Sequence, residues 1–139
     1  MNVSMPDRIP AIKLLLLPKD TNAFGTIFGG VILANIDLAS AVEARKTAPH
    51  RYVTRAMHEV EFHEPVYLGD IVSFYTDTVK VGRTSITVRV SVEAERWGSI
   101  QEPRAGHGER VKVTEAVVVL VAVNDQGQAV PIRRAPVQA

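Results

Sequence analysis

Residues 30–47 read GVILANIDLASAVEARKT, and this stretch decides the fold. Its apolar residues fall on almost every side of a helix, which is typical of a buried helix rather than a surface one. Arg45 and Lys46 fall in the last turn, where positive charge suits the helix dipole, and Pro49 ends the helix. We therefore predict a long helix over residues 30–47 that is buried on all sides.

Nearly all of the chain after this helix is predicted to be β-strand. The segment 84–97 shows the clearest pattern, because apolar residues from Ile86 to Ala94 alternate with polar residues from Ser85 to Glu93. A period of two gives one apolar face and one solvated face, which is typical of an antiparallel sheet. The predicted strands, including a short one before the helix, cover residues 12–17, 52–63, 71–81, 84–97 and 110–123.

The lengths of the helix and the strands point to one architecture. The longest alternating strand would span about 46 Å if it were straight, whereas the helix would be about 27 Å long. Strands of this length must coil, and a coiled sheet can wrap one apolar helix. We predict an α+β hotdog fold, with a long central helix wrapped by a coiled antiparallel five-stranded sheet. The domain is expected over residues 11–132, between a flexible N-terminal arm (1–10) and a C-terminal tail (133–139), with a mobile hairpin loop at 98–109.

The composition excludes several classes of protein. The 139 residues are 46% hydrophobic and 22% charged, which is typical of one globular domain. A net charge of +1 leaves no large basic field for nucleic acid or an anionic membrane. The absence of cysteine excludes disulfides, thiolate metal sites and cysteine nucleophiles. The longest apolar run, 116–123, is far shorter than the roughly 20 residues of a membrane span. We expect a soluble cytoplasmic protein without nucleic-acid or membrane partners.

Asp37 is the first candidate for chemistry, because it is the single charged residue between Thr21 and Val42. A carboxylate in a buried helix costs several kcal/mol unless it has partners. One interpretation is a structural aspartate that is satisfied by Ser40 or by an opposing backbone. The other is a catalytic carboxylate.

The second candidate is the pair Gly29-Gly30 at the start of the helix. Without side chains, the free amides of the first turn stay open at the positive end of the helix dipole. Such amides can bind a phosphate or the oxyanion of an acyl transfer. The alternative is a tight turn that needs positive φ. A phosphate-binding Gly-Lys-Ser/Thr loop and a dinucleotide-binding glycine motif are both missing from the sequence.

Histidines and glutamates give weaker signals. His58 and His63 are five residues apart, an odd offset that should send them to opposite faces of a strand, so we expect no shared metal. The cluster Glu59, Glu61 and Glu64 is interpreted as a solvated strand edge. We therefore predict no metal site.

Several short motifs together resemble the hotdog acyl-CoA thioesterases, most closely the short bacterial YciA-like acyl-CoA hydrolases and the related ACOT domains. The resemblance covers residues 12–132 and is specific in its combination, although each motif alone is weak. The matching segments are Asp20–Gly30 followed by Asp37, Val53-Thr54, Phe62–Val66, Leu68–Asp70, Val81–Ser85, Thr114–Ala116 and Val121–Asp125.

The resemblance implies roles for residues around the helix. Asp37 matches the family's catalytic carboxylate, and Gly29 and Gly30 match the glycines that polarise the thioester carbonyl. Some members carry Asn or Asp just before the helix, where this chain has Thr26, and Asn22 is a substitute candidate for that contribution.

The resemblance also implies a coenzyme A site and an assembly. The turn near the coenzyme A phosphates corresponds to Gly82, Arg83, Thr84 and Ser85. Coenzyme A is part of substrate and product, and no metal or redox cofactor is implied. The family is dimeric with shared active sites, and its dimers are often gathered into hexamers as trimers of dimers.

From this resemblance we expect an acyl-CoA thioesterase. Asp37 would either activate water as a general base or attack the carbonyl directly and form a mixed anhydride. Three alternatives remain open: a hydroxyacyl-thioester dehydratase, a non-catalytic acyl-CoA sensor and a purely structural oligomer.

The helix geometry itself predicts a shared site. Asp37 lies seven residues beyond Gly30, which is about 10.5 Å along the helix axis. One thioester carbon must lie near 3 Å from both its attacker and its oxyanion donors, so both groups of one chain cannot easily serve the same carbonyl. A two-fold, edge-to-edge homodimer with antiparallel helices would bring Asp37 of one subunit to the glycine amides of the other.

Overall fold

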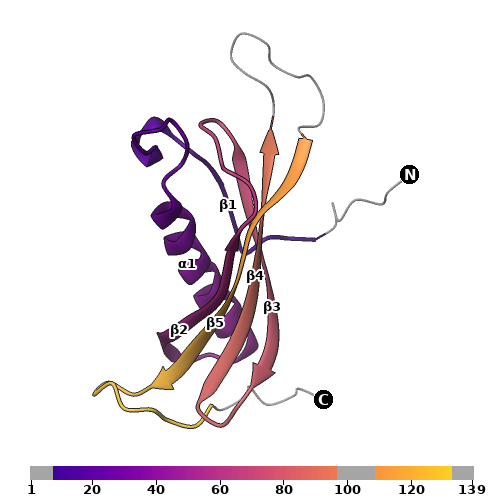
Figure 1. The fold of residues 1–139 in the computed structure, drawn as a ribbon. Coiled ribbons are helices and arrows are strands. Elements are labelled where there is room, and N and C mark those ends of the chain that lie inside the picture. Colours follow the sequence, from indigo (N-terminus) through magenta and orange to yellow (C-terminus); the bar gives the residue numbers. More distant parts are fainter. Residues whose placement is uncertain (1–7, 97–108, 133–139) are drawn as a thin grey trace.

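One long helix lies against one face of an open five-stranded antiparallel sheet (Figure 1). This computed structural model describes residues 8–96 and 109–132. The strand order across the sheet is β1-β3-β4-β5-β2, so β1 and β2 form the two edges. The elements are β1 (Ile12–Leu15), the 3-10 turn η1 (Pro18–Asp20), α1 (Gly29–Thr47), β2 (Arg51–Phe62), β3 (Ile71–Val81), β4 (Ser85–Arg96) and β5 (Glu109–Val123).

The predicted helix and the four long strands agree with the structure to within one residue at each end, except that the predicted strand end at Trp97 lies outside the described residues. The prediction for the first strand is wrong at its end, since β1 stops at Leu15 rather than Leu17. The amide of Leu16 still donates to the Asp70 carbonyl in the register of β1 and β3, but Pro18 then begins the 3-10 turn. The chain leaves the sheet here to form the loop that leads into α1.

The core lies between α1 and the inner face of the sheet. Val88, Val90 and Val92 of β4 are fully buried and alternate with more exposed polar residues, as the period of two predicts. Ile32 and Ile36 of α1 pack into the same cluster. Burying a side chain of this size contributes about 1.5–3 kcal/mol, so this face holds the helix on the sheet.

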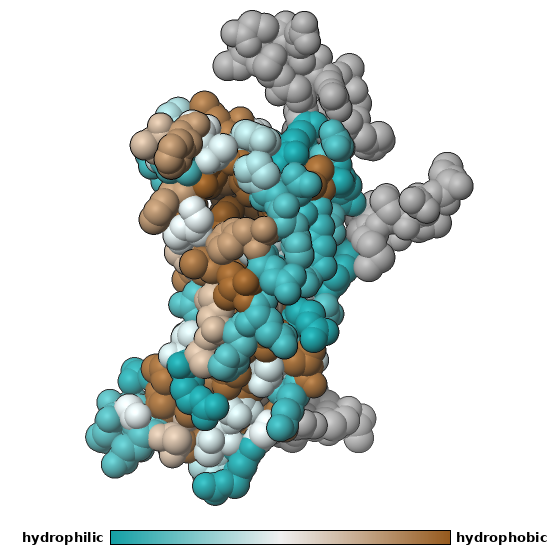
Figure 2. All heavy atoms as spheres, in the orientation of Figure 1, coloured by the Kyte–Doolittle hydropathy of each residue, from teal (hydrophilic) through white to brown (hydrophobic). Residues whose placement is uncertain are grey.

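The prediction that α1 is buried on all sides is wrong for the single chain. Ile36 is fully buried, but Leu38 is 58% exposed and Val42 is 39% exposed on the opposite side of the helix. The physical reason is that the open sheet covers only one side of α1. Figure 2 shows the consequence, with hydrophobic side chains reaching the surface over this part of the molecule.

The edge strand β2 contains an irregularity that the sequence analysis did not predict. Its pairing with β5 shifts between His58 and Glu61, where Glu59 adopts a φ of 52°. His58 lies opposite Val117 and Glu61 lies opposite Glu115. Val117 and Glu115 are alternate residues of β5 and share a face, so their partners His58 and Glu61 share a face too. His63 follows two residues after Glu61 and therefore falls on that face as well. The predicted opposite orientation of His58 and His63 is therefore wrong, because the bulge resets the alternation.

Some predictions fall outside the described residues. These are most of the N-terminal arm (1–10), nearly all of the hairpin loop at 98–109 and the tail at 133–139. Within the described part of the arm, Arg8 forms an ion pair with Asp77 and stacks over Tyr75. Among residues 8–96 and 109–132, no helix is both long and apolar enough to cross a membrane.

Candidate active site

Asp37 lies near the middle of α1, on the side of the helix that meets β2. Its Oδ1 accepts a hydrogen bond of 2.5 Å from the hydroxyl of Thr54 on β2. The residue is half-buried rather than buried, because it stands at the border between the covered and the open sides of the helix. The predicted cost of burying this charge is thus largely avoided, and the carboxylate is both fixed and accessible.

The structural interpretation of Asp37 named Ser40 or an opposing backbone as the partner of its carboxylate. The Ser40 hydroxyl donates instead to the backbone carbonyl of Asp37, at 2.7 Å. Thr54 makes the only hydrogen bond to the Asp37 carboxylate within the described part of the chain. Among the described residues, one carboxylate oxygen of Asp37 is therefore bound to Thr54 and the other, Oδ2, accepts no hydrogen bond.

The start of α1 presents open backbone amides. Phe28 occupies the N-cap position and offers no side-chain hydrogen bond, while the amide of Val31 donates to the Phe28 carbonyl. In residues 8–96 and 109–132, no hydrogen-bond acceptor contacts the amide of Gly29 or Gly30. Unpaired amides at a helix start attract negative charge.

Neither glycine is required for a left-handed backbone. The described glycines with positive φ are Gly25, Gly69 and Gly127, so the turn interpretation of Gly29-Gly30 is wrong. Gly30 has a packing reason instead, because a Cβ there would lie 2.4 Å from the Phe28 ring. The Phe28 ring can therefore lie close against the first turn.

A pocket of about 200 Å³ opens beside the first turn of α1. One wall is Gly29, and the ring of Phe62 lies 3.7 Å from the position that a Cβ on Gly29 would take. The remaining lining comes from the core and from the segment after β2, namely Ile27, Ile32, His63, Glu64, Pro65 and Val66. The pocket has a mainly apolar lining, and Gly29 at the start of α1 forms part of it.

The loop before the helix contains the candidates Asn22 and Thr26. The Asn22 side-chain amide donates to the Thr26 hydroxyl at 2.9 Å, and its oxygen accepts from the amides of Phe24 and Thr26. Both side chains are thus engaged in holding this loop, and no hydrogen bond joins either of them to Asp37 in the described residues.

The same loop is anchored by Asp20. Its carboxylate accepts a hydrogen bond from the Leu17 amide and pairs with Lys19, which together lower the pKa of Asp20. Its backbone carbonyl accepts from the amide of Phe28 and so connects the loop to the helix start.

The predicted coenzyme A residues lie at the other end of the helix. Gly82 to Ser85 form the turn between β3 and β4, closed by a hydrogen bond from the Gly82 amide to the Ser85 carbonyl. The C-terminal end of α1 reaches this end of β3, where Thr47 and Thr78 share a hydrogen bond (Figure 1). Within one chain, the turn and the open amides are therefore separated by about the length of the helix.

Two features were missed from sequence alone. Thr54 had a signal, because it lies in a segment of the resemblance, but its contact with Asp37 spans 17 positions and depends on the fold. Glu43 had no signal in the sequence. Its carboxylate accepts hydrogen bonds from the hydroxyls of Thr76 and Thr78 on β3. The helix thus carries two carboxylates, one bound to each of two strands.

The amino-acid sequence is similar to those of known proteins. Residues 24–98 match the family model of the thioesterase superfamily. A curated relative, the acyl-CoA thioester hydrolase YciA of Salmonella typhimurium, is 39% identical over 127 residues, which cover 91% of this chain and 90% of the relative.

Solved structures agree with the predicted fold. A hexameric hotdog fold thioesterase of Campylobacter jejuni has a TM-score of 0.81 and 46% identity, with 90% of each chain covered. An acyl-CoA hydrolase of Staphylococcus aureus, solved with butyryl coenzyme A and coenzyme A, has a TM-score of 0.74 and 26% identity, covering 88% of this chain and 70% of that one. The hotdog fold is confirmed.

Proposed function

The chain belongs to the thioesterase superfamily, and we propose that it hydrolyses acyl-CoA to a free carboxylic acid and coenzyme A. The observation that carries this proposal is the Asp37 carboxylate, fixed by Thr54 yet accessible, on the same helix that begins with open amides. The similar proteins named as acyl-CoA hydrolases support the substrate class.

Asp37 supplies the attacking group. As a general base, its free oxygen takes a proton from water while the water oxygen attacks the thioester carbonyl. As a nucleophile, it attacks the carbonyl itself and forms an anhydride that water then cleaves. In both routes the carbon–sulfur bond breaks and the sulfur leaves as coenzyme A thiolate, which is then protonated. The Thr54 hydroxyl holds the carboxylate in one orientation for either route.

The amides of Gly29 and Gly30 stabilise the negative charge that develops on the carbonyl oxygen. The pocket beside Gly29 then receives the acyl chain, since its lining of Ile27, Ile32 and Phe62 is apolar. The side chains of Asn22 and Thr26 hold the loop that shapes this end of the helix.

The site is completed by a second copy of the chain. Gly30 and Asp37 lie on one face of α1 but about 10.5 Å apart along its axis, too far to act on one carbonyl. Leu38 and Val42 leave the open side of the helix, which borders Asp37, apolar and exposed, and β2 is an edge strand. A two-fold dimer through β2 and α1 covers both, and the hexameric relative of Campylobacter jejuni supports assembly into trimers of dimers.

The same arrangement supports the coenzyme A site. Because antiparallel helices reverse end for end, the turn with Arg83, Thr84 and Ser85 of one copy lies toward the open amides of the other. Arg83 is exposed there and offers a guanidinium to a phosphate.

The test is coenzyme A release, followed with a thiol reagent. The chain has no cysteine, so the protein itself gives no background. Asp37→Asn is expected to lower turnover by about 1,000-fold, the scale of a lost general base, with little change in thermal stability because the amide oxygen still accepts from Thr54. The matched control is Glu43→Gln, which changes the other carboxylate of α1 and is expected to keep turnover within a few-fold.

Two outcomes would contradict the proposal. Near wild-type turnover in a folded Asp37→Asn variant would exclude Asp37 as the reacting group. Binding of acyl-CoA by the wild type without any release of coenzyme A would favour a sensor.

A further inference from the structure

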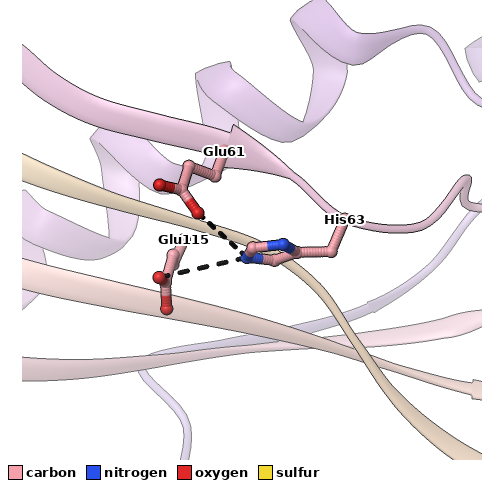
Figure 3. Close-up of side chains that lie close together, drawn as sticks. All are labelled: Glu61, His63 and Glu115. Atoms are coloured by element: carbon pink, nitrogen blue, oxygen red, sulfur yellow. Dashed lines mark ion pairs between the residues drawn. The ribbon is translucent and has the colours of Figure 1, made fainter.

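A second group of ionisable side chains lies where the end of β2 pairs with β5. Glu61 of β2 and Glu115 of β5 are direct cross-strand partners, and His63 follows two residues after Glu61. Figure 3 shows Glu61 and Glu115 on the two strands and His63 on the chain just beyond the end of β2, with the three side chains converging. We call them the Glu-His-Glu cluster.

The distances within this cluster suit a metal ion. His63 Nε2 lies 3.6 Å from a Glu61 oxygen and 3.9 Å from Oε1 of Glu115, and one ligating atom from each residue lies within 4.8 Å of the others. Ligands bound to zinc at about 2.0–2.2 Å in a tetrahedron are about 3.4 Å apart. Rotation of the two partly exposed glutamate side chains closes the remaining difference.

The charge around the cluster favours a cation. Carboxylates directly opposite each other on neighbouring strands repel, and Glu61 and Glu115 form such a pair. Lys112 contacts Oε2 of Glu115, which leaves Oε1 facing His63. A positive ion between the two carboxylates would relieve the repulsion and use the oxygen that Lys112 does not occupy.

The structure also provides space for further ligands. A cavity of about 310 Å³ adjoins the cluster and is lined by Glu59, Glu61, Arg89 and Glu115 together with two small apolar residues of β5. A water molecule needs about 30 Å³, so one or more waters fit beside a bound ion. Glu59 and Arg89 contribute opposite charges to the lining of this cavity.

We propose that His63 Nε2 and one carboxylate oxygen each from Glu61 and Glu115 bind a divalent transition metal ion, with zinc as the best fit. A histidine nitrogen and two carboxylate oxygens are a ligand set that zinc accepts, and water completes it. Glu61 and Glu115 stand on paired strands, and the backbone amide of His63, one residue beyond the end of β2, donates to the Val113 carbonyl of β5. Backbone hydrogen bonds to β5 therefore hold all three ligands in place. The proposal does not depend on the catalytic role of Asp37.

This site would also influence the pocket beside Gly29. His63 and Glu64 belong to the segment that lines that pocket. A metal bound to His63 would fix this wall without contributing an atom to the reaction.

The test is titration of the full-length protein, first treated with a chelator, with zinc chloride in a calorimeter and with cobalt chloride by absorption. We expect saturable binding of one ion per chain. His63→Gln and Glu115→Gln should each weaken binding by about 100-fold. Glu61→Gln, which changes the most exposed of the three ligands, should act in the same direction, and thermal unfolding shows that each variant is folded.

The matched control is His58→Gln. His58 lies on the same strand and the same face but outside the cluster, so this variant should bind zinc like the wild type. The proposal is overturned if the wild type shows no saturable binding, if His63→Gln binds equally well, or if His58→Gln loses as much affinity as the cluster variants.

Discussion

The two sides of α1 have similar amino acids but different surroundings. Toward the sheet, Ile32, Ile36 and Ala39 are almost completely buried, whereas Leu38 and Val42 on the other side remain open to solvent. An apolar helix side that the chain itself leaves uncovered is typical of an interaction surface. The comparison teaches that an all-round apolar helix can encode two interfaces, one within the chain and one between chains.

The largest effect is expected from a charge introduced on the open side of α1. We expect Leu38→Arg to dissociate the assembly and to lower coenzyme A release by about 100-fold or more, because burying unpaired charge in an interface costs several kcal/mol. The chain should stay folded, since the covered side is unchanged. Size-exclusion chromatography and the release assay measure both effects.

The matched change on the covered side is Ile36→Ala. It should lower the free energy of unfolding by about 3 kcal/mol, as expected for a buried large-to-small substitution, while the folded fraction keeps its assembly and turnover. If Leu38→Arg remained assembled and fully active, the open side of α1 would not be the interface.

Most of the fold could be predicted because each element carries its own periodic pattern. The alternation from Ile86 to Ala94 fixes β4 regardless of its neighbours. The bulge between His58 and Glu61 could not be predicted, since it arises from how β2 pairs with β5. The exposure of Leu38 was missed for a related reason: sequence shows that a residue is apolar but not which chain covers it.

The candidate site also has features that the sequence predicts and features that only the tertiary structure reveals. Asp37 and the open amides of Gly29 and Gly30 were predicted from local signals, a lone charge and a glycine pair at a helix start. The contact with Thr54 joins a helix to an edge strand, so only the tertiary structure reveals it. The role of the Asn22 side chain in holding its own loop likewise required the coordinates.

Subunit mixing tests whether the interface on the open side of α1 creates shared active sites, each with Asp37 from one subunit and the Gly30 amide from the other. Asp37→Asn and Gly30→Val are each expected to be inactive alone. In a mixed dimer with shared sites, one site carries both changes and the other carries neither. Random exchange should therefore restore about one quarter of wild-type activity, measured as coenzyme A release after the two variants are mixed.

Gly29→Ala is the control for the glycine variant, because a Cβ at Gly29 meets only the Phe62 ring, at an ordinary 3.7 Å. Gly29→Ala keeps the backbone amide and should fold like the wild type. If it stays active, the loss of activity in Gly30→Val comes from the bulk of its side chain rather than from any side chain at the helix start. Mixtures that stay inactive despite demonstrated exchange would place both groups of each site in one chain.

A smaller effect is expected at the far end of the helix. Arg83→Ala should raise KM for acyl-CoA by about tenfold, the scale of one charge-assisted hydrogen bond to phosphate. The turn should be unaffected, because the Arg83 backbone carbonyl, not its side chain, accepts the hydrogen bond from Ile132. An acyl-pantetheine thioester lacks the nucleotide phosphates, so its KM should not change. Equal losses on both substrates would exclude a phosphate contact.

The smallest effect concerns the loop that sets the start of α1. The pKa of Asp20 is lowered chiefly by the hydrogen bond from the Leu17 amide and also by Lys19. A lowered pKa in the folded state means that the ionised form stabilises the protein above the group's ordinary pKa of 3.8, and that this contribution is lost as the pH falls through the folded value. Asp20→Asn should therefore have a lower Tm than the wild type at neutral pH, and the difference should shrink in acid. A difference that stays constant from neutral pH to below pH 3 would mean that the charge of Asp20 does not hold this loop against the helix.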